Sequence, residues 1–205
     1  MIRQANLKDL NEIARLHTES FEGHFLPKLG LKLLTNYYKE FLDDKNIFLV
    51  HINEGNKIDG LLLGTQDSSI GRNKFIKNNQ VNLSVKMLLL SLKFDKDTWV
   101  RIIGSVKSLA SKLFVQGKGN AKRPNYKLIS LLSICVSQDS KGKGIANFLI
   151  EEFEKRLTKD NYEGYILTVH KMNERANKFY EKMGMDIYKE SDSEYGYMKL
   201  LVNEK

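Results

Sequence analysis

The chain has 205 residues, of which 41% are apolar and 28% are charged, and its net charge is +8. This composition is typical of a soluble globular protein and excludes a disordered or fibrous chain. The length suits one sizeable domain, or one domain that carries a large insertion.

Residue types that bind metals or form disulfides are scarce. The single cysteine, Cys135, excludes an internal disulfide and suits a reducing cytoplasm. It lies in an apolar run, where an inert buried thiol is more common than a nucleophile. The four histidines show no short metal-ligand spacing, so we predict no metal site. No secretory signal opens the sequence and no apolar run approaches the ~20 residues of a membrane span, so we expect a cytoplasmic protein.

The N-terminal part predicts a strand, two helices and a hairpin. Residues 2–4 can open a sheet, and apolar residues then recur at helical spacing over 9–21 and 30–42. The apolar runs 47–52 and 58–64 are separated by a polar, glycine-containing loop. They therefore predict two antiparallel strands.

A basic stretch, residues 67–126, follows this hairpin. It holds 12 Lys and Arg against 3 Asp and Glu, a net charge of +9, so the remainder of the chain carries −1. A polar segment, 67–80, precedes two predicted helices over 81–94 and 98–114, and 116–124 has the composition of a loop. All of the positive excess of the protein lies in this stretch.

Concentrated positive charge attracts anions, and three partners fit it: a phosphorylated or nucleotide-bearing substrate, an acidic membrane surface, or nucleic acid. Residues 86–94 are apolar enough to touch lipid, which would make the protein peripheral to a membrane. Such a helix is more often buried against its own domain or a second subunit, as in a homodimer. Nucleic acid is the least favoured partner, because no basic surface interleaved with aromatic residues is visible. A solvated cationic surface without a partner is the simplest alternative.

Residues 128–184 read as strand, glycine turn, helix, strand and helix. The apolar run Leu128–Val136 predicts a strand, and helical spacing of apolar residues begins at Ile145. Between them stand two glycines, Gly142 and Gly144, each preceded by a lysine. The first amides of a helix lack partners within the helix and its N-terminus is positive, so an anion fits this turn. An isolated G-x-G is more often a plain turn, so the sequence that follows has to decide.

The next elements place polar residues beside an aromatic pair. Gly164–His170 predicts a strand, and 173–184 predicts a helix with Asn173 as its N-cap and Gly184 as its stop. Two neighbouring stripes run along this helix, Asn173 with Asn177 and Tyr180, and Ala176 with Phe179 and Met183. One stripe can pack while the other faces a ligand. The segments 186–189 and 195–201 then predict two final strands.

Together these segments resemble the GNAT acetyltransferase superfamily. In that family a glycine motif, commonly Q/R-x-x-G-x-G/A, holds the pyrophosphate of acetyl-CoA. A later N-x-x-A-x-x-F-Y-x-x-x-G-F segment flanks its pantetheine arm. This chain matches the later segment at Asn173, Ala176, Phe179, Tyr180 and Gly184, with Met185 in place of the last phenylalanine. Asp139 takes the Q/R position of the glycine motif, with Gln138 one place earlier.

The resemblance implies an α/β fold of the α+β type: a central mixed β-sheet flanked by helices, with a helical insertion before the central cofactor-binding strand. Residues 1–205 would form a single GNAT-like domain, with 67–126 as its basic, mostly helical insertion. The implied acetyl-CoA contacts are Val136, Lys141, Gly142, Lys143, Gly144, Ile145, Ala146, Asn173, Asn177 and Phe179.

The same resemblance implies that the segment between the first two helices forms a wall of the acceptor site. Its candidate contacts are Phe21, Glu22, His24 and Phe25. A solvated turn for Glu22 and His24, and a core role for the two phenylalanines, is the alternative.

The expected reaction is direct attack of an amine on acetyl-CoA through a tetrahedral intermediate. A backbone amide near Val136 would stabilise the oxyanion. Tyr180 would act as general acid toward the departing thiolate, because a phenol of pKa ~10 keeps its proton at neutral pH. Glu19, Glu22, His24 or a chain of waters could take the proton of the amine. The expected acceptor is a primary amine of a small molecule, and the charge of the insertion suggests an amino sugar carried on a nucleotide. A non-catalytic acyl-CoA-binding or peripheral membrane protein with the same fold is the alternative.

Overall fold

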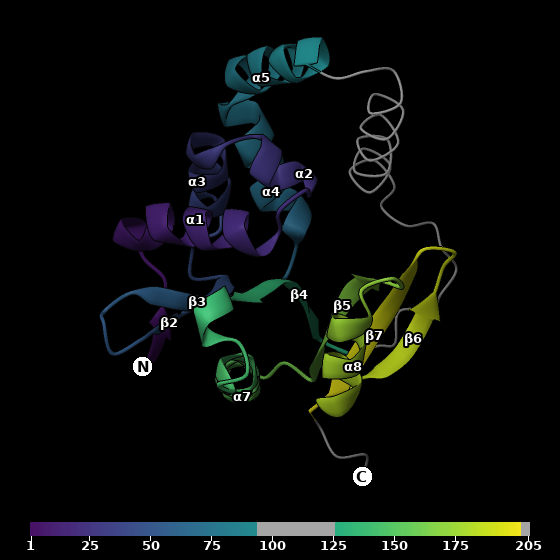
Figure 1. Ribbon diagram of the computed structural model, residues 1–205. Coiled ribbons are helices and arrows are strands. Elements are labelled where there is room, and N and C mark those ends of the chain that lie inside the picture. Colours follow the sequence, from purple (N-terminus) through teal and green to yellow (C-terminus); the bar gives the residue numbers. More distant parts are fainter. Residues whose placement is uncertain (94–125, 202–205) are drawn as a thin grey trace.

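The computed structural model describes residues 1–93 and 126–201, drawn in colour in Figure 1. The predicted helix over 98–114 and the predicted loop over 116–124 lie outside the described residues. Within the described ranges the chain folds around one seven-stranded sheet with the order β1-β2-β3-β4-β5-β7-β6. The strands are β1 (Ile2–Gln4), β2 (Asn46–Ile52), β3 (Ile58–Thr65), β4 (Leu128–Val136), β5 (Gly164–His170), β6 (Asp186–Glu190) and β7 (Glu194–Leu200).

The sheet is mixed: only β4 and β5 pair in parallel, and the other described neighbours are antiparallel. The parallel pair requires a crossover, and a helix between β4 and β5 supplies it. The helices are α1 (Leu10–Ser20), α2 (Phe25–Lys28), α3 (Leu31–Lys39), α4 (Ser68–Asn78), α5 (Gln80–Lys93), α7 (Ile145–Lys159) and α8 (Glu174–Lys182), with short 3-10 turns η1 (Leu7–Asp9) and η2 (Gln138–Ser140).

Helices cover both faces of the sheet (Figure 1). One core cluster packs α1 and α3 against side chains of the first face such as Phe48 and Leu61. The other packs α7 and the C-terminal strands against the opposite face, with Leu49 and Leu62. Residues 48 and 49 alternate between the two cores, because successive side chains of a strand point to opposite faces. This is the expected mixed sheet flanked by helices.

Helix α4 lies within the segment 67–80, for which the sequence shows polarity but no helical periodicity. Only Gly71 and Phe75 of this helix are buried, one turn apart, so its apolar stripe is too narrow to read from the sequence. The side chain of Asp67 caps the helix by accepting a hydrogen bond from the Ser69 amide at 2.8 Å. The first part of the basic insertion is therefore helical.

Helix α5 continues the insertion and exposes apolar side chains, among them Val81, Val85 and Leu89. None of the described helices is long and apolar enough to span a bilayer. A lipid surface or a second subunit as the partner of this helix stays a prediction.

Substitution of Gly64 by alanine should destabilise the fold. A Cβ at this position of β3 would overlap the ring of Phe153, which is fully buried on α7. We expect Gly64→Ala to lower the free energy of unfolding by about 1–3 kcal/mol, as overpacking does elsewhere, measured by urea denaturation. In the Phe153→Leu background, Gly64→Ala should lower the free energy of unfolding by less than it does in the wild type. Strictly additive losses would contradict this close contact.

Candidate active site

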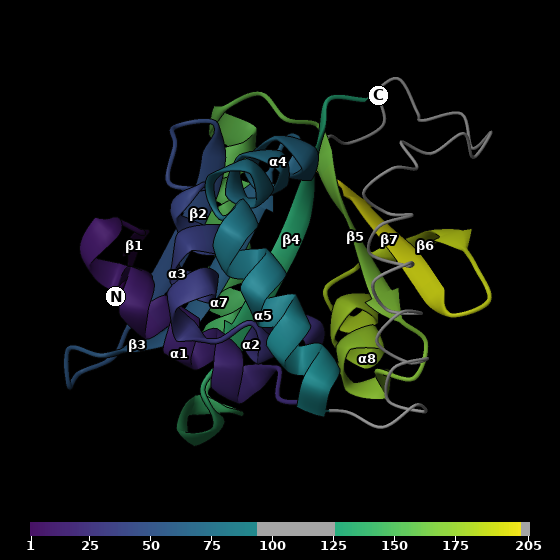
Figure 2. The same cartoon turned by 90° about the horizontal axis from the view of Figure 1, so that it is seen from above.

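The central feature of the site is the separation of the two parallel strands. The pairing of β4 with β5 joins Leu128–Ser130 to Gly164–Ile166 and then stops, although β4 continues to Val136 and β5 to His170. Figure 2 shows the two strands close together at one end and apart at the other. Backbone groups along the separated edges have no strand partner across the gap, so they can bind a ligand.

The amide of Val136 faces this gap. Ser137 donates its amide hydrogen to the carbonyl oxygen of Asp59 on β3, at 2.8 Å. Amide directions alternate along an antiparallel strand, so Cys135 also directs its amide toward β3 and Val136 directs its own toward the opposite edge. That edge is where β5 has separated from β4. The predicted oxyanion donor therefore has the required direction.

The glycine turn after β4 leaves the N-terminus of α7 open. Gly142 and Gly144 have φ of 82° and 77°, the left-handed conformation that glycine adopts without strain. Gly144 is the N-cap of the 15-residue helix, and no side chain caps the first amides. A Cβ added to Gly142 would meet no atom within 4 Å, so the space beside this backbone is clear. Uncapped amides and the helix dipole together suit a phosphate group.

A cleft of about 490 Å³ connects this turn with the separated strands. Its walls come from the end of β4, the start of α7 and one face of α8, with three basic side chains. They are Ser20, Phe21, Ile134, Cys135, Val136, Ser140, Lys141, Gly142, Gly144, Ile145, Ala146, Asn147, Asn173, Arg175, Ala176, Phe179, Tyr180 and Lys182. Open amides and the cations Lys141, Arg175 and Lys182 give this cleft the character of a site for an extended polyanion.

A second cavity, of about 630 Å³, adjoins the cleft on the side of α1 to α5. We call it the acceptor cavity. Its walls are mainly apolar and aromatic, and it shares Phe21, Ile134, Asn173, Ala176 and Tyr180 with the cleft. The other lining residues are His17, His24, Phe25, Leu26, Leu29, Tyr37, Tyr38, Leu63, Arg72, Phe75, Ile76, Leu83, Met87, Leu131, Leu132, Ser133, Leu167, Thr168, Val169 and His170.

Tyr180 lies where the two spaces meet, with only 6% of its surface exposed. Burial raises the pKa of its hydroxyl above the ordinary value for a phenol. In the part of the chain that the structure describes, that hydroxyl has no hydrogen-bond partner. A buried, protonated and uncommitted phenol at this junction can donate a proton to a group bound in the cleft.

Most of the predicted cofactor contacts line the cleft, and two do not. Those in the cleft are Val136, Lys141, Gly142, Gly144, Ile145, Ala146, Asn173 and Phe179. Lys143, between the two left-handed glycines, lines a neighbouring cavity instead. Asn177 is buried, and its amide nitrogen donates to the carbonyl oxygens of Lys171 at 3.0 Å and His170 at 3.4 Å. The side chain of Asn177 therefore holds the connection between β5 and α8.

The predicted division of α8 into a packing stripe and a ligand stripe is not observed. Asn173 and Tyr180 of one stripe line the cleft together with Ala176 and Phe179 of the other. Asn173 is the N-cap, as predicted, and its side chain accepts from the Ala176 amide at 3.2 Å. Gly184 follows the helix with φ of 73°, also as predicted.

Three of the four predicted acceptor contacts line the acceptor cavity: Phe21, His24 and Phe25. Glu22 lines neither space, and Glu19 lines a separate cavity. Among the residues considered as the base, His24 is therefore the one that lines the acceptor cavity. His17 also lines the cavity, but burial lowers its pKa to about 4, so it is a weak base.

Arg175 and Lys182 are cleft residues that the sequence analysis missed. They stand seven residues apart on α8 and so share one helical face, on the side of Phe179. Their helical spacing beside Phe179 and Tyr180 was the sequence signal that could have predicted them as cleft residues.

The structure favours a different register for the glycine motif. Asp139 lines a separate cavity, outside the cleft. A match two residues later, Lys141-x-x-Gly144-x-Ala146, places all three motif residues in the cleft. Lys141 then takes the position of the polar first residue, and a cation there suits a phosphate better than the carboxylate of Asp139.

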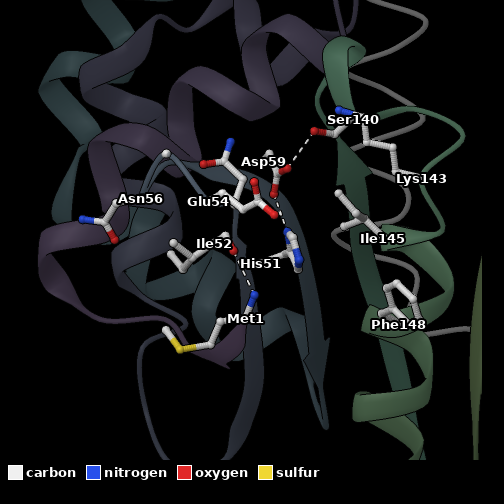
Figure 3. A pocket seen from close by; sticks show the side chains of 12 residues that line it. Met1, His51, Ile52, Glu54, Asn56, Asp59, Ser140, Lys143, Ile145 and Phe148 are labelled. Atoms are coloured by element: carbon white, nitrogen blue, oxygen red, sulfur yellow. Dashed lines mark hydrogen bonds and ion pairs between the residues drawn. The ribbon is translucent and has the colours of Figure 1, made fainter.

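The buried carboxylate of Asp59 binds the glycine turn, and we call its contacts with the turn the brace (Figure 3). Asp59 accepts a hydrogen bond from the Ser140 hydroxyl at 2.7 Å, and its other oxygen lies 2.5 Å from Nδ1 of His51. The carbonyl oxygen of Asp59 binds the Ser137 amide. One residue of β3 therefore ties both the start and the middle of the turn to the sheet.

The sequence model of the Acetyltransferase (GNAT) family matches residues 101–185, a range that holds the glycine turn and the segment around Tyr180. Over that range the sequence resembles the GNAT acetyltransferases. Members of this family transfer an acetyl group from acetyl-CoA to an amine, so the resemblance points to acetyl-CoA as the co-substrate. No curated protein sequence matches the chain significantly.

Solved acetyltransferases share the GNAT fold at low sequence identity. Ard1 from Thermoplasma volcanium superposes with a TM-score of 0.58 at 15% identity, over 99% of this chain and 98% of its own. The ribosomal-protein-S18-alanine N-acetyltransferase from Escherichia coli gives 0.59 at 11%, over 100% and 96%. The PaiA N-acetyltransferase from Thermoplasma acidophilum, solved in complex with coenzyme A, gives 0.56 at 14%, over 98% of each chain.

The residues of the cleft fit acetyl-CoA. The amides that follow Gly144 are uncapped, and the space that a Cβ on Gly142 would fill is clear, as close approach of a pyrophosphate requires. Lys141, Arg175 and Lys182 supply charge around it. We infer that these groups hold the phosphates, while the separated edges of β4 and β5 receive the pantetheine arm.

Substitution of Gly142 by alanine should weaken coenzyme binding specifically. The added methyl group would occupy the clear space beside the turn, so we expect the affinity for coenzyme A to fall at least about tenfold, a loss of ~1.4 kcal/mol, in isothermal titration calorimetry. Gly184→Ala is the matched control, because Gly184 also has positive φ and also has no atom within 4 Å of an added Cβ. Both variants should lose similar stability from backbone strain. Equal affinities in the two variants would show that the turn does not contact the coenzyme.

Removal of the brace should also weaken coenzyme binding. Ser140→Ala deletes one hydrogen bond to the buried Asp59 carboxylate, and Asp59→Ala deletes the contacts to both Ser140 and His51. We expect the affinity for coenzyme A to fall about three- to tenfold in the first variant, corresponding to roughly 1 kcal/mol per bond, and further in the second. Unchanged affinity in two folded variants would assign the brace to folding alone.

Proposed function

We propose that the protein transfers the acetyl group of acetyl-CoA directly to the primary amine of a small molecule with an apolar body. The observation that carries this proposal is the meeting of the coenzyme cleft and the acceptor cavity at Tyr180. Donor and acceptor can occupy the two spaces together, so no covalent intermediate on the protein is needed.

Each residue at the junction has a separate role in this proposal. Acetyl-CoA supplies an activated thioester when it is bound. The Val136 amide, directed into the gap between the strands, donates to the oxygen that becomes negative during attack. The Tyr180 hydroxyl donates its proton to the departing sulfur, and burial keeps that proton in place before the reaction. His24 is the wall residue that we assign to receive the proton of the amine.

Transfer through an acetylated cysteine is the less favoured route. Cys135 lines the cleft, but burial raises the pKa of its thiol to about 12. The thiolate is the nucleophilic form, and very little of it exists at neutral pH when the pKa is this high. Direct attack by the amine therefore fits this site better.

The walls of the acceptor cavity select an apolar amine over an amino sugar. Leucine, phenylalanine and other apolar side chains form most of its surface, and the hydroxyl groups of a sugar would find few partners there. The amino sugar that the charge of the insertion suggested is thus not supported by the described walls. The Escherichia coli relative modifies an alanine of ribosomal protein S18, so a protein N-terminus is the competing acceptor.

Release of coenzyme A from acetyl-CoA in the presence of an amine panel tests this function. The panel contains apolar primary amines, glucosamine and short peptides with free N-termini. We expect the apolar amines to accelerate thioester consumption and to be recovered as their N-acetyl derivatives. Coenzyme binding without acceleration by any amine would support the alternative of a non-catalytic acyl-CoA-binding protein. Acceleration by peptides alone would replace the small-molecule acceptor with a protein.

Replacement of Tyr180 by phenylalanine should lower turnover more than coenzyme affinity. Loss of a general acid typically costs on the order of 100-fold in kcat, whereas the retained ring should keep the Kd for acetyl-CoA within about threefold, since its apolar packing is unchanged. Steady-state kinetics and calorimetry measure the two effects. Because burial raises the pKa of Tyr180, the wild type should lose no activity through this group below about pH 10.

Tyr195→Phe is the control for that substitution, because Tyr195 on β7 lines neither the cleft nor the acceptor cavity. Its turnover should equal that of the wild type. Equal turnover in Tyr180→Phe and Tyr195→Phe would remove Tyr180 from the role of general acid.

A further inference from the structure

One cation, Arg72 of α4, lines the acceptor cavity. Among the described residues that line this cavity, Arg72 of α4 is the only arginine or lysine, and none is an aspartate or glutamate. The surrounding walls are mainly apolar and aromatic. A guanidinium beside apolar walls is stabilised by an anion that binds to it.

The hydrogen bonding of Arg72 points in the same direction. Its Nε atom is buried and has no hydrogen-bond partner within the described ranges 1–93 and 126–201. Buried polar atoms of native proteins are rarely left unpaired, and such an atom calls for an explanation such as a ligand. The Nε–H group is half of the fork through which arginine binds a carboxylate.

The neighbouring phenol does not neutralise this charge. Tyr37 lines the cavity beside Arg72, and burial raises its pKa to about 12 even though the Arg72 charge opposes that rise. Tyr37 is therefore protonated and neutral at physiological pH. It therefore supplies no negative charge to the guanidinium.

Packing holds Arg72 in place. The preceding residue, Gly71, is buried, and an added Cβ there would lie 2.6 Å from the ring of Phe41, which follows α3. Phe75, one turn later, is also buried and makes an edge-on contact with Tyr37, with ring centroids 5.5 Å apart. The backbone on both sides of Arg72 is thus fixed, which suits a residue that positions a ligand.

We propose that Arg72 binds a carboxylate of the acceptor, so that the substrate is an amine with an apolar body and a carboxylate. The amine is directed to the junction at Tyr180, the apolar body fills the cavity, and the carboxylate pairs with the guanidinium. Amino acids with apolar side chains and ω-amino fatty acids have this chemistry. This inference rests on the proposed acetyl transfer to a small amine and identifies the class of acceptor.

A carboxylate fits this position better than a phosphate. The cavity offers one formal positive charge from Arg72 among apolar walls, and a carboxylate carries one negative charge. A phosphate ester carries nearly two negative charges, and the second would stay unpaired there. The planar fork of the guanidinium also matches the two oxygens of a carboxylate.

Matched amine pairs test the proposal. Leucine is compared with 3-methylbutylamine, phenylalanine with phenethylamine, and 6-aminohexanoate with hexylamine, so that each pair differs by the carboxylate. The proteins are the wild type, Arg72→Met, Arg72→Lys and the control Lys74→Met. Lys74 lies two residues along the same helix, is exposed, and does not line the cavity. The control therefore removes the same charge from α4 without changing the cavity wall.

For at least one pair, we expect the wild type to have the higher kcat/KM for the carboxylate. Arg72→Met should lower that value at least about tenfold, mainly through KM, because a charge-assisted bond is worth that factor. The kcat/KM of Arg72→Met for the amine without a carboxylate should stay within about twofold of the wild-type value. The kcat/KM of Arg72→Lys for the carboxylate should lie between the values of the wild type and Arg72→Met, because lysine keeps the charge but lacks the planar fork. Lys74→Met should match the wild type throughout.

Binding provides a readout separate from turnover. The N-acetyl derivative of the preferred carboxylate should raise the thermal unfolding midpoint of the wild type and Lys74→Met but not of Arg72→Met. Without ligand, Arg72→Met should unfold at the wild-type temperature or above it, because an unpaired cation has been removed. A large loss of stability would assign Arg72 to folding and overturn the proposal.

The failures of the two proposals are distinguishable. If no small amine is acetylated while coenzyme A binds, the proposed function itself fails. The function stands and the role of Arg72 is overturned in two cases. In the first, the wild type acetylates both members of every pair with equal kcat/KM. In the second, Arg72→Met lowers kcat/KM equally for both members of a pair.

Discussion

The site depends on an interrupted hydrogen-bond ladder. Strands β4 and β5 share three residue pairs and then diverge, which leaves backbone edges in the centre of the molecule without strand partners. Such groups are costly to bury unpaired, and here they border the cleft where, in the proposed reaction, a coenzyme arm and an oxyanion need donors and acceptors. Helices on both faces of the sheet allow this opening. Helices α1 and α3 pack on one face and α7 packs on the other, so the strands stay in place although β4 and β5 separate.

The glycine turn contains two residues of high conformational freedom and is held to β3 by hydrogen bonds. Gly142 and Gly144 take left-handed conformations that expose the first amides of α7. Asp59 on the adjacent strand counters this freedom by binding Ser137 through its backbone and Ser140 through its carboxylate. A turn that must approach a phosphate closely is therefore fixed before the ligand arrives, which lowers the entropy lost on binding.

The sequence predicted the architecture well, because strong periodicities and end signals marked nearly every element around the sheet. Asn173 and Gly184, for example, delimit α8 through capping preferences that act locally. Side-chain directions within the turn could not be predicted, since turn residues follow no period, and Lys143 consequently faces a different cavity from Lys141. Helix α4 was missed for a related reason: it buries only Gly71 and Phe75, so tertiary packing and not amphipathicity defines it. Arg72, which lies between them, could be recognised only once the cavity was visible.

In the proposed reaction, the location of Arg72 separates two tasks that many enzymes combine in the same loops. Tyr180, Val136 and the glycine turn belong to the sheet and to the helices that follow it, whereas α4 belongs to the stretch inserted between β3 and β4. The proposed contact to the acceptor carboxylate thus resides in a different stretch of sequence from Tyr180, Val136 and the glycine turn. An exchange of α4 between related chains could redirect the enzyme to another amine while its catalytic apparatus remained intact. Diversification of such a scaffold would then proceed by replacement of a module and not by rebuilding of the reaction centre.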